Sequence, residues 1–348
     1  MIFSPADGSP LRLRKFSQTV RRCDGSPLRL IHKFCVNHRN LRDKIISKKL
    51  TKHCNRLLYF KEIFLNTHNQ SILFLSLYSG KTWGYHTMNR IVTLFEKQPT
   101  RNLNVYFTAG FPETKDTRRI LKTLQSTGAD LVEIGMPYSD PVADGETIQA
   151  SNQQALESGM TVQLLFEQLQ DMRSEIDIPV LLMGYINPVL QFGVENFCKR
   201  CAEVGVDGLI LPDMPMAIYL EEYKTIFERY GLLNIFLITP QTSDERIKQI
   251  DEVSSGFIYM VSSSSVTGSQ SGVSNNMEDY FERINAMKLA NPRLIGFGIK
   301  DSSTFDMACR HASGAIIGSA FIRMLQESCD LEKDISAFVK GIKGEKLV

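Results

Sequence analysis

The sequence lacks any hydrophobic run long enough to cross a membrane. Its longest apolar stretch near the start, residues 72–78, is far shorter than the ~20 residues that a membrane-spanning helix needs. Cysteine is also sparse, because the seven cysteines are an odd number without the spacing of a disulfide framework. These absences argue against a membrane protein and against a small secreted domain, and they favour a cytoplasmic protein.

Clustered metal ligands are lacking as well. The sequence CKRC at 198–201 is a paired-cysteine motif, but it lies in a helical pattern and no second pair follows. A zinc or redox role stays open, and two incidental helix cysteines are the preferred interpretation. His311 is the single histidine after residue 87. We therefore predict no metal site.

Charge is distributed unevenly along the 348 residues. Residues 1–87 contain 16 Lys and Arg against four Asp and Glu, whereas the remainder contains 24 against 34. Such a division predicts a basic extension (1–87) attached to an acidic globular domain (88–348). The ample hydrophobic content of the chain, 43%, suffices for a large core.

Three interpretations of the basic extension compete. The sequence DGSPLRL occurs twice, at 7–13 and 24–30, which is too few copies for a repeat protein. An organelle transit peptide and a nucleic-acid-binding tail are two interpretations of its positive charge. We prefer the third, a disordered segment or a misassigned start, because Met88 begins a segment typical of a native amino terminus. We therefore expect no nucleic-acid partner and no membrane partner.

From residue 88 onward, short apolar runs alternate with amphipathic segments. This alternation predicts a parallel sheet, and eight such units match the (β/α)₈ TIM barrel. An open doubly wound sheet is the alternative, but no G-x-G-x-x-G follows the first strand. The predicted strands are 104–108, 131–135, 179–184, 208–211, 234–238, 257–261, 293–297 and 314–318. The predicted helices are 115–127, 162–175, 194–204, 217–230, 243–253, 277–289, 302–311 and 331–342.

Two carboxylates occur in one informative run, LVEIGMPYSDPVADG at 131–145. Glu133 lies in a buried strand, where an acid must be paired, protonated or functional. Asp144 ends the loop that follows. One acid on a rigid strand and one on a loop suit proton-transfer chemistry.

The carboxyl ends of the last strands carry glycines in a pattern typical of phosphate binding. Gly296 and Gly298 follow the seventh strand, and Gly318 with Ser319 opens a helix after the eighth. The segment VTG at 266–268 can supply a third wall. A small phosphorylated metabolite is the expected ligand, because no Walker lysine motif accompanies these glycines.

With these motifs, residues 88 to about 340 resemble the tryptophan synthase alpha subunit family. The resemblance is carried by the run at 131–145, by SSVTG at 264–268, by GFGI at 296–299 and by GAIIGSA at 314–320. It implies a lyase that splits indole-3-glycerol phosphate into indole and glyceraldehyde 3-phosphate. It also implies a β-subunit partner in an α2β2 heterotetramer, with pyridoxal phosphate in that partner only and no cofactor in this chain.

The resemblance also implies roles for individual residues. Glu133 is the expected acid and base, Asp144 the group that holds the indole N–H, and Tyr259 a positioning group. The implied phosphate contacts are Gly268, Gly298, Gly318 and Ser319. The implied contacts to indole and glycerol are Tyr106, Ile148, Tyr185, Thr267, Phe297 and Ile316, for which ordinary barrel packing is the competing interpretation.

Two rival functions remain open at this stage. One is a stand-alone lyase of the same family without a β partner. The other is a non-catalytic subunit that binds phosphate and activates its partner. The serines at 262–265, Glu146 and Lys300 depart from the usual family pattern, in or near loops expected to close over substrate.

Overall fold

The chain divides into two units, residues 1–85 and 86–348, which are considered separately. The computed structural model describes residues 88–142, 144–261, 275–296 and 298–344, together with two strands of the first unit. These strands, β1 (Glu62–Thr67) and β2 (Gln70–Leu75), pair antiparallel. The predictions for residues 1–87 otherwise lie outside the described residues and stay predictions.

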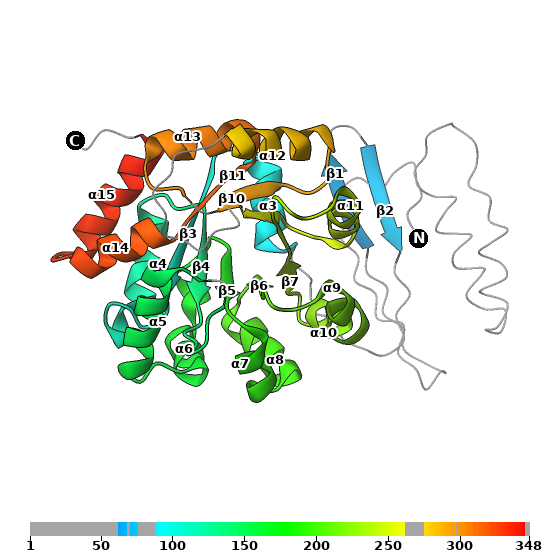
Figure 1. Ribbon diagram of the computed structural model, residues 1–348. Helices are drawn as coiled ribbons and strands as arrows, with labels where there is room; N and C mark the ends of the chain where they lie inside the picture. The colour runs from blue at the N-terminus through cyan, green and yellow to red at the C-terminus, as the bar shows by residue number, and fades with distance from the viewer. Residues whose placement is uncertain are drawn as a thin grey trace, which may run out of the picture. The chain divides into compact units, whose positions relative to one another are not determined.

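The second unit is a barrel of parallel strands surrounded by helices (Figure 1). Each strand pairs with the next along the chain, except that β7 and β8 do not pair with each other, and the last pairs with the first, which confirms the predicted (β/α)₈ architecture. The strands are β3 (Asn102–Thr108), β4 (Leu131–Gly135), β5 (Val180–Met183), β6 (Gly208–Ile210), β7 (Leu233–Ile235), β8 (Leu237–Ile238), β9 (Ile258–Val261), β10 (Arg293–Gly296) and β11 (Gly314–Ile317).

The fifth barrel strand is divided into β7 and β8, although the sequence predicted one strand at 234–238. β7 pairs with β6, whereas β8 pairs with β9, so the strand changes partner between them. Phe236 lies at this change, and its carbonyl oxygen accepts a hydrogen bond of 2.9 Å from the Tyr259 N–H. The division therefore closes the barrel.

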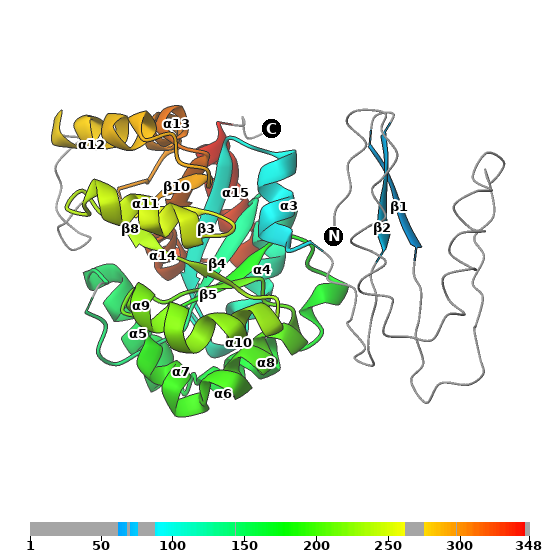
Figure 2. The ribbon, with the colours of Figure 1, turned by 90° about the vertical axis from the view of Figure 1, so that its right-hand side faces the viewer.

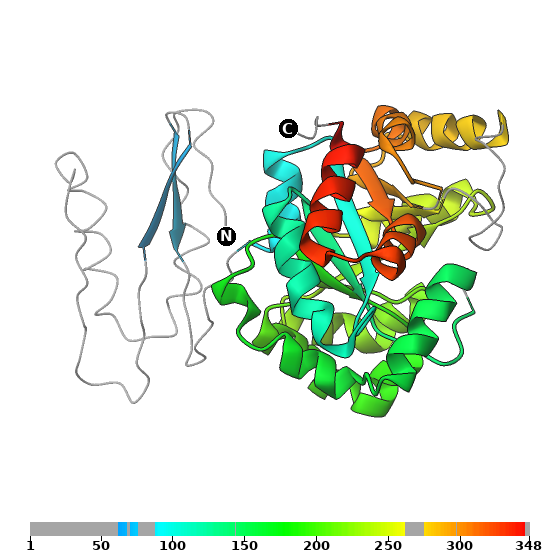
Figure 3. The same ribbon diagram turned by 90° about the vertical axis from the view of Figure 1, so that its left-hand side faces the viewer.

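Helices cover the outside of the barrel. Figure 3 shows the last helix, α15, beside α4 and α14, with which it packs. The helices are α3 (Arg90–Lys97), α4 (Thr117–Ser126), α5 (Glu146–Glu157), α6 (Val162–Gln168), α7 (Ile186–Phe192), α8 (Val194–Val204), α9 (Met216–Ile218), α10 (Lys224–Arg229), α11 (Asp244–Val253), α12 (Asn275–Ala286), α13 (Ser302–His311), α14 (Ser319–Glu327) and α15 (Leu331–Lys343). Two 3₁₀ turns, η1 (Thr114–Asp116) and η2 (Met172–Ser174), and a π-helical segment, η3 (Tyr219–Tyr223), complete the set.

Several predicted helices differ in their extent. The helix predicted at 162–175 ends at Gln168, because Asp171 adopts a left-handed backbone conformation (φ 55°) before η2. The helix predicted at 217–230 consists of α9, η3 and α10 in succession. Helices α3, α5 and α7 were not predicted.

Helix α3 closes the amino-terminal end of the barrel (Figure 2). Its buried Ile91 and Phe95 pack against inward-facing residues of the strands, and Phe95 lies 5.8 Å from the Phe257 ring. Asn89 caps the helix and also donates to the carbonyl oxygen of Asp207. With this end filled, a ligand has access only from the carboxyl ends of the strands.

Candidate active site

Glu133 lies in the barrel interior. It is the middle residue of β4, and the alternation of a strand directs its side chain inward with that of Leu131. Glu133 is fully buried. Its Oε1 accepts a hydrogen bond of 2.5 Å from Nδ2 of Asn104 on β3, whereas Oε2 has no partner among the described residues. One oxygen is anchored, and the other is available to a bound molecule.

The surroundings of Glu133 favour proton transfer. Burial raises the pKa of its carboxyl to about 8, and the hydrogen bond from Asn104 opposes part of that shift. A buried acid with a structural role is held by an ion pair, as Asp207 is by Arg173. No residue in the described part of the chain forms an ion pair with Glu133. A carboxyl with a pKa near neutral pH can both give and take a proton, as a general acid or base must.

The raised pKa also predicts how the stability of the fold depends on pH. The folded-state pKa of Glu133 lies above the ordinary value of 4.5. The stability that its protonated carboxyl contributes to the fold is therefore fully present below pH ~4.5 and is lost as pH rises through 8. The loss is on the order of 4 kcal/mol. We expect Glu133→Gln to be more stable than the wild type at pH 9 in chemical denaturation, with a smaller difference at pH 5. The exposed Glu157→Gln variant is the control. A difference in the free energy of unfolding between wild type and Glu133→Gln that is the same at every pH would contradict the prediction.

Asp144 lies at the end of the loop between β4 and α5. Its Oδ2 accepts a hydrogen bond of 3.1 Å from the Tyr185 hydroxyl, and its carbonyl oxygen accepts one from Nε2 of Gln149. Burial raises the pKa of Asp144, and the Tyr185 hydrogen bond opposes that shift. The structure thus brings together two predicted site residues, Asp144 and Tyr185, from the loop after β4 and the end of β5.

Two tyrosines, Tyr106 on β3 and Tyr259 on β9, share the interior with these carboxyls. Burial raises the pKa of both phenols, and the charges of Asp144 and Glu133 raise them further. Both phenols therefore stay protonated and can donate hydrogen bonds.

The tyrosine rings fit over glycines. A Cβ added to Gly135 would lie 2.1 Å from the Tyr106 hydroxyl oxygen, and one added to Gly296 would lie 2.3 Å from that of Tyr259. Glycine is therefore required for this close approach at both positions.

A small pocket opens beside Tyr106 and Asp144, and neither Glu133 nor Tyr259 is among the residues that line it. It is lined by Tyr106, Met136, Asp144, Asn152, Met183, Gly184, Tyr185 and Pro212. Polar oxygens of Asp144 and Tyr185 thus face apolar side chains, a combination suited to a planar aromatic molecule with one N–H donor.

The helix after β11 offers an anion site. Gly318 precedes α14, and no side chain caps the first turn, so the amide N–H groups starting at Ser319 remain available. By contrast, Asp301 caps α13 in a capping box with Thr304, so the start of that helix is already occupied. Gly298, between β10 and α13, is exposed, and open space surrounds its Cα.

The remaining predicted residues fall into two groups. Ile148 is buried on α5 in the layer between strands and helices, and Ile316 belongs to the inward-facing cluster of the barrel. Neither lines the pocket, and their roles as substrate contacts stay predictions. Thr267, Gly268 and Phe297 lie outside the described residues.

Sequence reasoning missed several polar residues of the site. Asn104 was assigned to a strand without a role, yet it contacts Glu133. Thr108 shares a hydrogen bond of 2.7 Å with Ser151 of α5, and Asn152 lines the pocket. The detectable signal was the polar residues Asn104 and Thr108, each two residues from Tyr106, all on one face of a buried strand.

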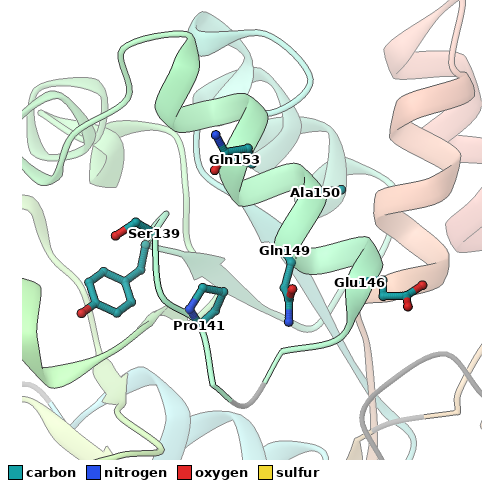
Figure 4. Close-up of a pocket in the computed structure, with 7 residues that line it drawn as sticks. Ser139, Pro141, Glu146, Gln149, Ala150 and Gln153 are labelled. Atoms are coloured by element: carbon teal, nitrogen blue, oxygen red, sulfur yellow. The ribbon is translucent and has the colours of Figure 1, made fainter.

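A second, more open pocket lies between the β4–α5 loop and the outer side of α5 (Figure 4). Ser139 and Pro141 of the loop face Glu146, Gln149 and Gln153 of the helix. This pocket is separate from Glu133, and its walls include the loop that carries Asp144.

Metal and thiol chemistry find no support in the described part of the chain. None of its His, Cys, Asp and Glu side chains form a group of three that could hold a metal ion. Cys198 and Cys201 are buried in α8, and burial raises the pKa of the Cys198 thiol to about 12. Both cysteines therefore pack as apolar helix residues.

A sequence model of the family described as "Tryptophan synthase alpha chain" matches residues 94–345. The chain is 60% identical over 241 residues to a tryptophan synthase alpha chain of Flavobacterium johnsoniae, covering 69% of this chain and 95% of that one. It is 54% identical to one of Christiangramia forsetii, covering 74% of this chain and 99% of that one.

Solved structures agree. A Mycobacterium tuberculosis tryptophan synthase structure is similar with a TM-score of 0.67 and 28% identity, covering 75% of this chain and 99% of that one. A tryptophan synthase complex from Pyrococcus furiosus is similar with a TM-score of 0.63 and 31% identity, covering 70% of this chain and 98% of that one.

Proposed function

The chain belongs to the tryptophan synthase alpha chain family, lyases that cleave indole-3-glycerol phosphate, and from that premise we propose that Glu133 and Asp144 perform the cleavage here. The observation that carries the proposal is the fully buried Glu133 carboxyl with one anchored and one unpartnered oxygen. The reaction yields indole and glyceraldehyde 3-phosphate in the last stage of tryptophan biosynthesis.

Glu133 acts first as an acid and then as a base. Its carboxyl delivers a proton to the ring carbon that bears the glycerol phosphate side chain. The resulting carboxylate then takes the proton of the adjacent side-chain hydroxyl. The carbon–carbon bond breaks as the aldehyde forms, and its electron pair restores the indole ring. The carboxyl ends protonated, as it began, because its pKa lies near neutral pH.

Asp144 supports the other end of the ring. Protonation of the ring carbon places positive charge on the ring nitrogen, and the Asp144 carboxylate stabilises that charge while accepting the N–H hydrogen bond. Tyr185 holds Asp144 in position through its hydroxyl. Tyr259 and Tyr106 orient the substrate beside Glu133.

The phosphate binds at the start of α14. Its oxygens accept hydrogen bonds from the N–H groups that follow Gly318, from the Ser319 hydroxyl and from the Gly298 backbone. Gly268 is the remaining phosphate contact in this proposal. Contacts of Thr267, Phe297, Ile148 and Ile316 with the indole and glycerol are part of the proposal on the family resemblance alone. The chain requires no cofactor of its own, and pyridoxal phosphate belongs to the partner subunit.

We place the β subunit on the face where the pocket opens. The exposed apolar side chains Val142, Leu190, Ile218 and Leu220 follow β4, β5 and β6 at that end of the barrel. A tryptophan synthase complex among the similar structures is consistent with such a partner. The assembly we propose is an α2β2 tetramer in the cytoplasm. No helix in the described part of the chain is long and apolar enough to span a membrane.

Val142 tests this placement, because its side chain is 82% exposed. We expect Val142→Asp to weaken activation by a β subunit about tenfold or more, while indole release by the chain alone is unchanged. The matched control is Met88→Asp, an exposed apolar residue before α3 at the closed end of the barrel. Equal effects of both variants on activation would contradict the placement.

Indole release from indole-3-glycerol phosphate by the full chain, measured with and without a β subunit, tests the proposed function. We expect release in both cases and a higher rate with the β subunit. Release that the β subunit leaves unchanged would indicate a stand-alone lyase. No release under either condition, with the partner's activity still raised, would indicate a non-catalytic activator.

A further inference from the structure

Asn104 is a polar residue in a place where packing alone favours an apolar one. It lies on β3, directly between Leu131 of β4 and Ile316 of β11 in the sheet register, and it is fully buried. Its Nδ2 donates to Oε1 of Glu133 at 2.5 Å, while its Oδ1 has no partner in the described part of the structure. An amide with an unsatisfied oxygen in this position is destabilising unless it serves another purpose.

We propose that Asn104 is a positioning residue for the cleavage, holding the Glu133 side chain in one place in both of its protonation states. The inference rests on the proposed role of Glu133 as acid and base. It goes further in assigning the residue that keeps this carboxyl aligned while its proton leaves and returns.

The argument rests on the amide N–H of Asn104. When Glu133 is ionised, Nδ2 of Asn104 donates to Oε1 of the carboxylate, which is the arrangement observed. When Glu133 is protonated for transfer to the substrate, its proton lies on Oε2, and Oε1 is then the carbonyl oxygen and still accepts from Nδ2. The same hydrogen bond therefore anchors Oε1 in both states and leaves Oε2, which has no partner among the described residues, for the substrate.

A charged side chain could not hold Glu133 in both states. A lysine or arginine would strongly favour the ionised acid, and an aspartate would compete for the same proton. The titratable neighbours of Glu133 do not replace Asn104. Glu133 interacts through charge with Tyr106 on β3 and Tyr259 on β9, both of which also interact with Asp144 of the β4–α5 loop. The hydrogen bond that shifts the pKa of Glu133 is that of Asn104.

Asn102 provides a matched comparison on the same strand. It is also fully buried and lies two residues earlier, so its side chain is on the same face of β3. Its Oδ1, like that of Asn104, has no partner among the described residues. Its Nδ2, however, donates to the carbonyl oxygens of Gln98 and Ser313, at 2.8 and 3.0 Å, so the two residues differ in what the amide N–H holds. Asn102 therefore closes the start of the strand and does not serve Glu133.

The test is the pH dependence of kcat/KM for indole release by the full chain. In Asn104→Leu, we expect the inflection that belongs to Glu133 to move upward by about one to two pH units, the effect of losing a hydrogen bond to a charged group. We expect kcat to fall about 10- to 100-fold with little change in KM. Asn102→Leu should leave the inflection where it is in the wild type, although it removes a buried amide of the same kind.

Asn104→Asp has nearly the same shape and keeps the test decisive if the leucine variant does not fold. Two adjacent buried carboxyls share one proton, so we expect an upward shift larger than that of Asn104→Leu. A profile of either variant that superimposes on the wild type would overturn the inference. Glu133→Gln separates the two proposals: full activity of that variant contradicts the role of Glu133 itself, whereas an inactive Glu133→Gln with an unmoved Asn104 profile contradicts only the role of Asn104.

Discussion

Replacing Glu133 with glutamine is expected to lower kcat for indole formation by ~10²–10⁴-fold or more, the range for removing a general acid or base. Glutamine fills the same space, and its oxygen can still accept the hydrogen bond from Asn104. Its amide, however, neither delivers a proton to the ring carbon nor takes one from the hydroxyl. KM should change little, because the substitution leaves the proposed phosphate site at the start of α14 intact. Steady-state release of indole from indole-3-glycerol phosphate measures both constants.

Asp116 supplies the matched control for this variant. It is a buried acid of the same barrel, and burial raises its pKa too, but it lies in η1 beside Arg119 and not on a barrel strand. Asp116→Asn should therefore leave kcat unchanged. If it lowers kcat as far as Glu133→Gln does, the loss reflects a disturbed barrel and the role of Glu133 as acid and base is contradicted.

The strand that carries Glu133 could be predicted because its sequence and its surroundings agree. Four apolar or small residues flank one acid at 131–135, and β4 has these bounds. A central barrel strand is buried on both faces, so its apolar run is continuous and a carboxyl stands out in it. For the same reason the barrel itself could be predicted from the alternation of runs.

Helix α5 could not be predicted, because its buried side is partly polar. Its sequence, ETIQASNQQALE, buries Ser151 and Asn152 beside Ile148 and Ala155. Ser151 faces Thr108 of β3, and Asn152 lines the pocket. Polar residues that serve the site thus interrupt the apolar period by which a helix is recognised.

Asn104 escaped prediction for a related reason. A single asparagine at the start of a strand is typical of a strand end or turn, and only the three-dimensional register places it beside Glu133. The divided fifth strand likewise depends on barrel closure, a property of all the strands together. Local sequence carries neither kind of information.

Asp144→Asn is expected to lower kcat by ~10²–10³-fold, comparable with losing a group that stabilises transition-state charge. The asparagine oxygen can still accept the indole N–H, so binding should weaken less than turnover. It carries no negative charge to oppose the positive charge on the protonated ring. Steady-state indole release by the chain alone measures the effect, and Tyr185→Phe, which removes the hydrogen bond to Asp144, should lower kcat about tenfold.

The control is Asp140→Asn, the same substitution in the same loop. Asp140 is exposed, its carboxylate accepts from the neighbouring Ser139 hydroxyl, and it does not line the pocket that Asp144 lines. The kcat of Asp140→Asn should equal that of the wild type. A loss of kcat as large as that of Asp144→Asn would contradict the specific role of Asp144.

The pH profile adds a test that a disturbed loop cannot imitate. Burial raises the pKa of Asp144, so the carboxylate is lost as pH falls through that value, and wild-type kcat should fall on this acid side. The asparagine variant has no such charge to lose, so its low rate should lack that inflection. In the proposed mechanism the two carboxyls have different roles: Glu133, with a pKa of about 8, keeps a proton to deliver, while Asp144, held by Tyr185, is ionised and faces the positive charge. An acid-side inflection that persists unchanged in Asp144→Asn would contradict this division.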